Sequence, residues 1–84
     1  MYDYYVIEIQ TNADGTSGNF VFGYADKGAA EDKYLTLRQF ARQSAVHIHT
    51  ILWIDKMGAT VDKKVYIHPI PEPEPETEET PGEE

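Results

Sequence analysis

The sequence predicts an α+β fold, a two-layer sandwich in which one helix lies on one face of a mainly antiparallel four-stranded sheet. Two observations lead to this prediction. Residues 4–11 and 44–55 alternate their side chains with the period of two that a β-strand imposes. Between them, residues 27–44 repeat apolar side chains at the spacing of an amphipathic helix. With two further strand segments, the predicted order is strand, strand, helix, strand, strand.

The first two strands are expected to form a hairpin. The segment YYVIEIQT, residues 4–11, places Tyr5, Ile7 and Ile9 on one face of the first strand. NADGTSGN follows as a loop dense in turn-forming residues, and FVFGY, residues 20–24, is predicted to be the second strand. Two strands joined by a short polar loop most simply pair in the antiparallel sense.

The helix is expected to begin after Asp26, whose side chain suits the N-cap position. Arg38 and Arg42 gather toward its other end, where positive charge interacts favourably with the helix dipole. The residues expected on its buried face are Ala30, Tyr34, Leu37 and Ala41, with Phe40 beside them. Ser44 and Ala45 leave only a short connection to the third strand.

A second hairpin is predicted to follow the helix. Gly58-Ala59 suits a two-residue type II′ turn, because that turn favours glycine at its first central position. This turn sets Leu52 opposite Val65 and His49 opposite His68. A register shifted by one residue would place apolar side chains opposite polar ones, so the hydrophobic pattern favours the first pairing.

The sheet is expected to have an uncovered outer face. Four strands span about 19 Å, whereas one helix is about 10 Å across, so a single helix leaves most of the sheet surface open. The third strand places Val46, Ile48, Leu52 and Ile54 on one face, interpreted as the inner one. An apolar outer face predicts an interaction module, either a homodimer or a small subunit docking on another protein. The residues expected to form this interaction face are Tyr4, Val6, His49, Ile51, Trp53, Tyr66 and His68.

Histidines suggest an alternative function. Paired residues on antiparallel strands have Cβ atoms about 5 Å apart, so His49 and His68 could share one metal ion. With His47 on the same face, the alternative is a metal or small-molecule site, possibly with enzymatic activity. The chain has no cysteine, and no P-loop, nucleophilic triad or paired catalytic carboxylates stand out. The sequence therefore favours a protein without a cofactor that is not an enzyme.

Charge divides the chain into two parts. All five prolines lie in residues 69–84, which also hold seven of the fifteen acidic residues and no lysine or arginine. The remaining eight acids nearly balance the seven bases, leaving a net charge of −1 on residues 1–68. Such a body lacks the basic surplus typical of nucleic-acid binding. Residues 1–68 are therefore predicted to be one small domain, followed by a disordered acidic tail at residues 69–84.

The sequence suggests a cytoplasmic protein that does not enter membranes. Its first residues lack the basic segment of a signal peptide, and no apolar run is long enough to span a bilayer.

Four segments, YYVIEIQTNADGTSGNFVFGY, AAEDKY, SAVHIH and VYIH, show a resemblance to other proteins. Over residues 4–68 the chain resembles small uncharacterised proteins encoded in phage-like or mobile-element regions of gut Gram-positive bacteria. The resemblance implies a bacterial or phage cytoplasmic accessory protein, and it supplies no catalytic residues.

Overall fold

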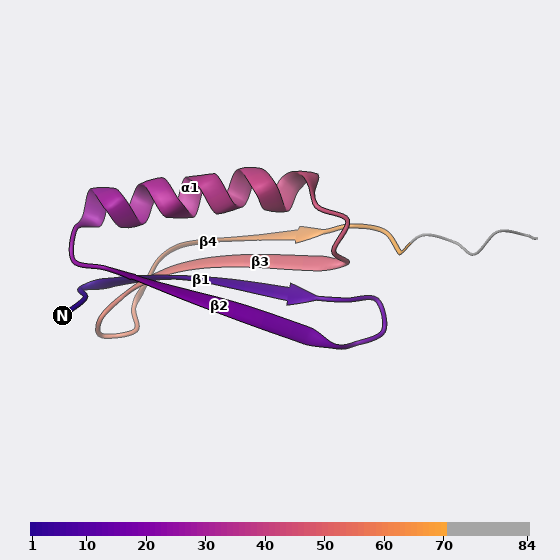
Figure 1. Ribbon diagram of the computed structural model, residues 1–84, viewed down its shortest axis with the longest axis horizontal. Helices are drawn as coiled ribbons and strands as arrows, with labels where there is room; N and C mark the ends of the chain where they lie inside the picture. Colours follow the sequence, from indigo (N-terminus) through magenta and orange to yellow (C-terminus); the bar gives the residue numbers. More distant parts are fainter. Residues whose placement is uncertain (71–84) are drawn as a thin grey trace, which may run out of the picture.

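The computed structural model describes residues 1–70 of the chain and confirms the predicted α+β architecture (Figure 1). The elements follow the predicted order: β1 (Tyr4–Thr11), β2 (Ser17–Tyr24), α1 (Lys27–Gln43), β3 (Ile48–Asp55) and β4 (Thr60–Ile67). The second strand is longer than its apolar segment indicated, because Ser17, Gly18 and Asn19 also pair with β1. Of the predicted acidic tail, only Pro69 and Ile70 fall within the described residues.

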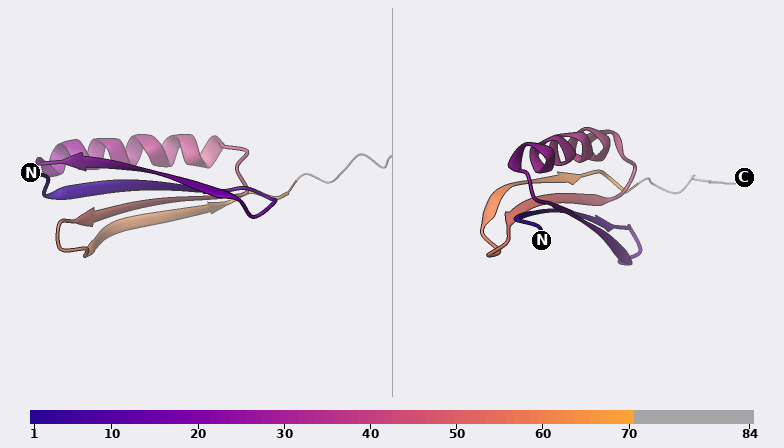
Figure 2. Two further views of the ribbon diagram at one scale, coloured as in Figure 1. Left: turned by 60° about the horizontal axis from the view of Figure 1, so that its bottom comes forward. Right: turned by 60° about the vertical axis from the view of Figure 1, so that its left-hand side comes forward.

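The four strands form one sheet in the order β2-β1-β3-β4, and all neighbouring strands are antiparallel. The helix lies along one face of this twisted sheet, mainly above β1 and β3 (Figure 2). The chain therefore crosses from β2 at one edge, over β1, to β3. Because β2 and β3 both run antiparallel to β1, they are parallel to each other, and α1 is the crossover connection between them.

Both hairpins close with the same turn. In the first, the Asn12 N–H donates to the Thr16 carbonyl (2.8 Å) and the Gly15 N–H donates to the Asn12 carbonyl (3.0 Å). In the second, the Asp55 N–H donates to the Ala59 carbonyl (2.9 Å) and the Gly58 N–H donates to the Asp55 carbonyl (3.0 Å). The fourth residue of each turn is a glycine with positive φ, 91° at Gly15 and 87° at Gly58. Such three-residue loops place glycine in the left-handed region.

The predicted type II′ turn at Gly58-Ala59 is therefore wrong, and so is the predicted pairing of β3 with β4. The observed partners are Leu52 with Lys63 and His49 with Tyr66, a shift of two residues from the predicted pairing. A further irregularity between Trp53 and Ile54 leaves Val61 without a partner. Since the shift is even from Asp62 to Ile67, each of these side chains keeps the face of the sheet that the predicted pairing gave it.

The helix matches its prediction closely. Its N-cap is Asp26, whose carboxylate accepts from the Ala29 N–H at 2.9 Å. The buried side chains are the four expected ones, Ala30, Tyr34, Leu37 and Ala41. Two of them are alanines, which allow the helix backbone to approach the sheet closely, while Phe40 is 65% exposed.

The face of the sheet that α1 covers is the one predicted to be open. Val6 and Ile51 are fully buried beneath the helix, and Trp53 is only 6% exposed. The Trp53 ring lies 5.6 Å from that of Tyr34, centroid to centroid. The assignment of inner and outer faces was therefore wrong. That assignment was based on which face carries more apolar residues. The covered face is instead decided by the handedness of the crossover, and crossover connections between parallel strands are almost always right-handed.

Candidate functional site

The surface that the structure leaves uncovered is the opposite face of the sheet. Successive side chains of a strand alternate between faces, so the residues between those of the core point away from α1. Across β2, β1, β3 and β4 they form cross-strand rows, such as Val21, Ile7, Leu52 and Lys63. We call this surface the open face; its apolar residues are Tyr5, Ile7, Ile9, Val21, Ile48, Leu52, Ile54, Val65 and Ile67.

The open face is accessible to solvent. Its edge residues are the most exposed, with Val21 at 57%, Val65 at 45% and Ile67 at 70%. The central residues on β1 and β3 are half-buried, as expected where neighbouring side chains on a sheet shield one another. Within residues 1–70, no helix or strand packs over this surface (Figures 1 and 2).

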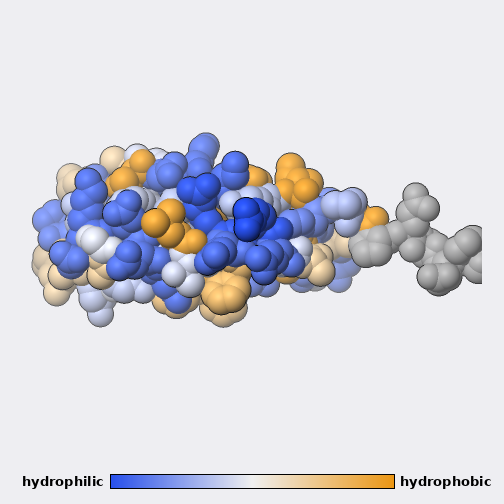
Figure 3. Space-filling model, turned by 90° about the horizontal axis from the view of Figure 1, so that it is seen from above, coloured by the Kyte–Doolittle hydropathy of each residue, from blue (hydrophilic) through white to orange (hydrophobic). Residues whose placement is uncertain are grey.

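Charge is nearly absent from the open face. In the four strands, the only charged side chain in its rows is Lys63, at one edge. The remaining polar members, including Asn19 and Thr50, are uncharged. By contrast, the side of the molecule that carries α1 is largely hydrophilic, with separate hydrophobic spots (Figure 3). Extended apolar surfaces without charge typically mark interaction sites on soluble domains.

The residues predicted to form the interaction face do not form one. Val6, His49, Ile51 and Trp53 are buried under the helix, where no partner can reach them. Tyr4 and Tyr66 are half-buried and pack against the same core. His68, also half-buried, points its Nε2 to the Ala41 carbonyl of α1 at 2.8 Å. The predicted set therefore belongs largely to the core, and the interaction face must be sought on the other side.

The predicted histidine cluster is also not assembled. His47 places its Nδ1 2.8 Å from the His68 carbonyl oxygen, whereas His49 turns its Nε2 to Glu8. His49 and His68 are not paired across the strands, because Tyr66 takes the position opposite His49. Residues 1–70 contain no group of three or more His, Cys, Asp or Glu side chains able to hold a metal ion. Each histidine has instead its own hydrogen-bond partner.

Glu8 is a polar residue of the core that no sequence pattern singles out. Its carboxylate lies 2.5 Å from His49 Nε2, and the two residues are only 8% and 3% exposed. Gln10 Nε2 donates to the same Glu8 oxygen at 3.2 Å. The other ring nitrogen of His49, Nδ1, is buried without a partner. The sequence pattern shows that Val6, Glu8 and Gln10 share one face of β1. It does not show that β1 lies next to β3, which is what brings Glu8 to His49.

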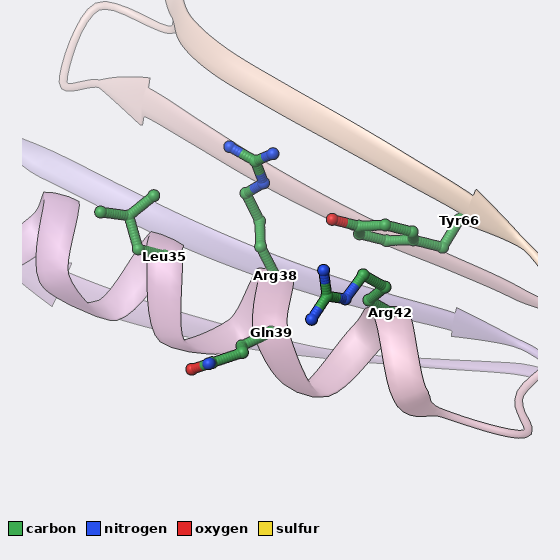
Figure 4. A pocket seen from close by; sticks show the side chains of 5 residues that line it. All are labelled: Leu35, Arg38, Gln39, Arg42 and Tyr66. Carbon is green, nitrogen blue, oxygen red and sulfur yellow. The ribbon is translucent and has the colours of Figure 1, made fainter.

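A groove between α1 and β4 is the second notable surface feature. It is open to solvent, has a volume of about 280 Å³, and is lined by Leu35, Arg38, Gln39 and Arg42 from the helix and by Tyr66 from the strand (Figure 4). A hydrogen bond with the Tyr66 side chain raises the pKa of Arg38. The sequence placed both arginines at the end of the helix but gave no sign that they border a groove.

Tyr34 is a core residue close to Arg38, which lines this groove. Burial raises the pKa of Tyr34 to about 12, and the nearby Asp62 carboxylate acts in the same direction. The Tyr34 hydroxyl is nevertheless without a hydrogen-bond partner. The guanidinium carbon of Arg38 lies 5.5 Å from the Tyr34 ring centroid, which helps to hold the arginine in place.

Searches of protein-family models, curated proteins and solved structures give no match to the chain. The resemblance to proteins of phage-like and mobile-element regions therefore stays a prediction. Within residues 1–70, no helix combines the length and the apolar character needed to cross a membrane. The geometry of residues 1–70 favours the open face as the candidate functional site.

Proposed function

We propose that this chain is a small interaction module that pairs with a second copy of itself, open face against open face. The observation that carries the proposal is the open face itself, an apolar sheet surface with one charged residue at its edge. A domain that exposes such a surface gains free energy by removing it from water. The product would be a β-sandwich of two sheets with a helix on each outer side.

The size of the open face suits a homodimer. Strands of eight residues are about 27 Å long, and four of them span about 19 Å, so each copy offers roughly 500 Å² of flat area. Side-chain relief enlarges the accessible area, and two copies would bury on the order of 1,000 Å² or more, which reaches the range of specific interfaces. A two-fold axis lets the same surface serve both copies, and an almost uncharged face avoids repulsion between them.

The wider role is proposed from the same features. A self-pairing module without a catalytic constellation in residues 1–70 fits an accessory protein, the class that the sequence resembles, and we place it in the bacterial cytoplasm. Enzymatic use of the histidines has little support, since His49 is buried against Glu8.

Val21→Lys tests the proposal with little risk to the fold, because Val21 lies on an edge strand and its side chain is 57% exposed. Phe40→Lys is the matched control: it also introduces lysine at an exposed apolar position, but on the helix side. Sedimentation equilibrium should report twice the 9.6 kDa chain mass for the wild type and for Phe40→Lys. Val21→Lys should shift toward the single-chain mass. A wild type that stays monomeric at all concentrations, or equal effects of both variants, would contradict the homodimer.

A further inference from the structure

We propose that the groove between α1 and β4 is a second binding site, which takes a carboxylate ligand of about the size of a glutamate side chain or a small dicarboxylate. The groove lies on the helix side of the sheet, away from the open face, so this proposal is independent of self-association. Its volume of about 280 Å³ accommodates a small ligand rather than a folded partner.

The groove presents two positive charges side by side. Arg38 and Arg42 are one helical turn apart, so their side chains project from the same side of α1. The Tyr66 ring lies along the groove, with its hydroxyl directed toward the two arginines (Figure 4). Neither arginine forms an ion pair with a carboxylate of residues 1–70. Both guanidinium groups therefore retain donors for an incoming anion.

Lys64 and His68 also lie close to the Tyr66 ring. Lys64 Nζ lies 5.5 Å from the Tyr66 ring centroid, and the His68 ring stacks on Tyr66 with centroids 6.5 Å apart. One acid, Asp62, raises the pKa of both Tyr34 and Arg38. Two of the chain's seven lysines and arginines thus line the groove and a third, Lys64, lies near its tyrosine, in a domain whose charges otherwise nearly cancel. This concentration attracts an anion.

The surroundings favour a carboxylate over a phosphate. A planar guanidinium matches the two oxygens of a carboxylate through parallel hydrogen bonds. Phosphate sites usually add backbone N–H groups at the start of a helix. Here Arg42 lies in the last turn of α1, where the helix dipole is negative, and Asp62 adds a further negative charge. These negative charges disfavour a phosphate dianion, which concentrates two charges on one group, relative to a carboxylate group, which carries one.

Two sources could supply the carboxylate: a free ligand, or the glutamates between Glu72 and Glu84, which follow β4 in the chain. His68, four residues before Glu72, is already anchored to α1 through the Ala41 carbonyl. The experiment must therefore compare the native chain with a full-length variant in which every glutamate after residue 70 is replaced by glutamine.

Binding of glutarate to both chains should be followed by NMR through the side-chain signals of the arginines and the ring signals of Tyr66. Saturable shifts at these groups are expected, and Arg42→Gln should weaken binding by about tenfold. Lys27→Gln removes an equal charge at the start of α1 and should have little effect. Equal binding by both chains would assign the site to a free ligand. Tighter binding by the glutamine variant would show that the chain's own glutamates compete for the groove.

Three results would overturn the proposal. These are no saturable shift in either chain, equal weakening by Arg42→Gln and Lys27→Gln, and inorganic phosphate binding at least as tightly as glutarate. The oligomeric mass of each variant, measured in parallel, keeps this outcome separate from the fate of the homodimer.

Discussion

Replacing His49 with leucine should destabilise the fold strongly, because it leaves the Glu8 carboxylate buried without its partner. Glu8 is 8% exposed and lies 2.5 Å from His49 Nε2. Removing the partner of a buried carboxylate typically costs about 3–5 kcal/mol. Gln10 Nε2, at 3.2 Å from the same oxygen, continues to donate to it. We therefore expect a loss at the lower end, about 3 kcal/mol.

The double variant Glu8→Leu/His49→Leu should recover most of that loss. It removes both polar groups together and leaves two apolar side chains beside Val6 and Ile51, and such replacements of a buried pair are often neutral or stabilising. For a domain of this size, a loss of about 3 kcal/mol lowers Tm by roughly 12–24 °C. Thermal and urea unfolding of the wild type, both single variants and the double variant gives the coupling energy.

The reasoning is refuted if the two single substitutions are additive. Additivity would mean that Glu8 and His49 do not depend on each other for their hydrogen bonds. A His49→Leu protein as stable as the wild type would have the same meaning, since a carboxylate buried without its partner cannot be free of cost.

Three further changes test other parts of the structure. Gly58→Ala should lower the free energy of unfolding by about 1 kcal/mol, because Gly58 has φ +87°. The control Gly18→Ala, at a glycine without positive φ, should cost less. Equal losses of the two variants in urea unfolding would refute the turn. Trp53→Ala should lower the unfolding free energy by about 3–5 kcal/mol rather than act on association alone, and a fold that tolerates it would contradict the core. Tyr34 should ionise near pH 12, so stability should be constant up to about pH 10 and fall between pH 10 and 12, where the unfolded state ionises first. Absorbance titration should show this late ionisation in the wild type and lose it in Tyr34→Phe.

The sequence predicted the local structure well, because local patterns determine it. The alternation in residues 4–11 defined β1, and Asp26 with the apolar repeat defined α1 together with its four buried residues. These features depend on residues within a few positions of one another. Each therefore leaves a pattern in the sequence that periodicity and capping rules can recognise.

The pairing of β3 with β4 could not be read in the same way. Met57 and Gly58 allow two hairpin loops that differ by one residue, and the structure adopts the longer one. The unpaired Val61 then moves the register back by one residue, so that the pairs beyond it differ from the predicted ones by two residues. Bulges leave only a weak trace in a sequence, because a bulged residue resembles any other strand residue.

The candidate site was misplaced for a different reason. Apolar content suggested that Ile7, Ile9 and Leu52 form the core, yet α1 covers the face with Glu8, His49 and Trp53. Which face is covered depends on strand order and on crossover handedness, neither of which alternation reveals. The polar residues Glu8 and His49 are tolerated under the helix because they form a hydrogen bond with each other.

The most direct test of self-association through the open face is an isotope-filtered NOE experiment on a mixture of labelled and unlabelled protein. The account predicts contacts between copies at the Ile7, Leu52 and Val65 methyl groups, and none at the helix side chains Leu35 and Phe40. Contacts between copies that involve α1, or a concentrated sample without any such contacts, would contradict it.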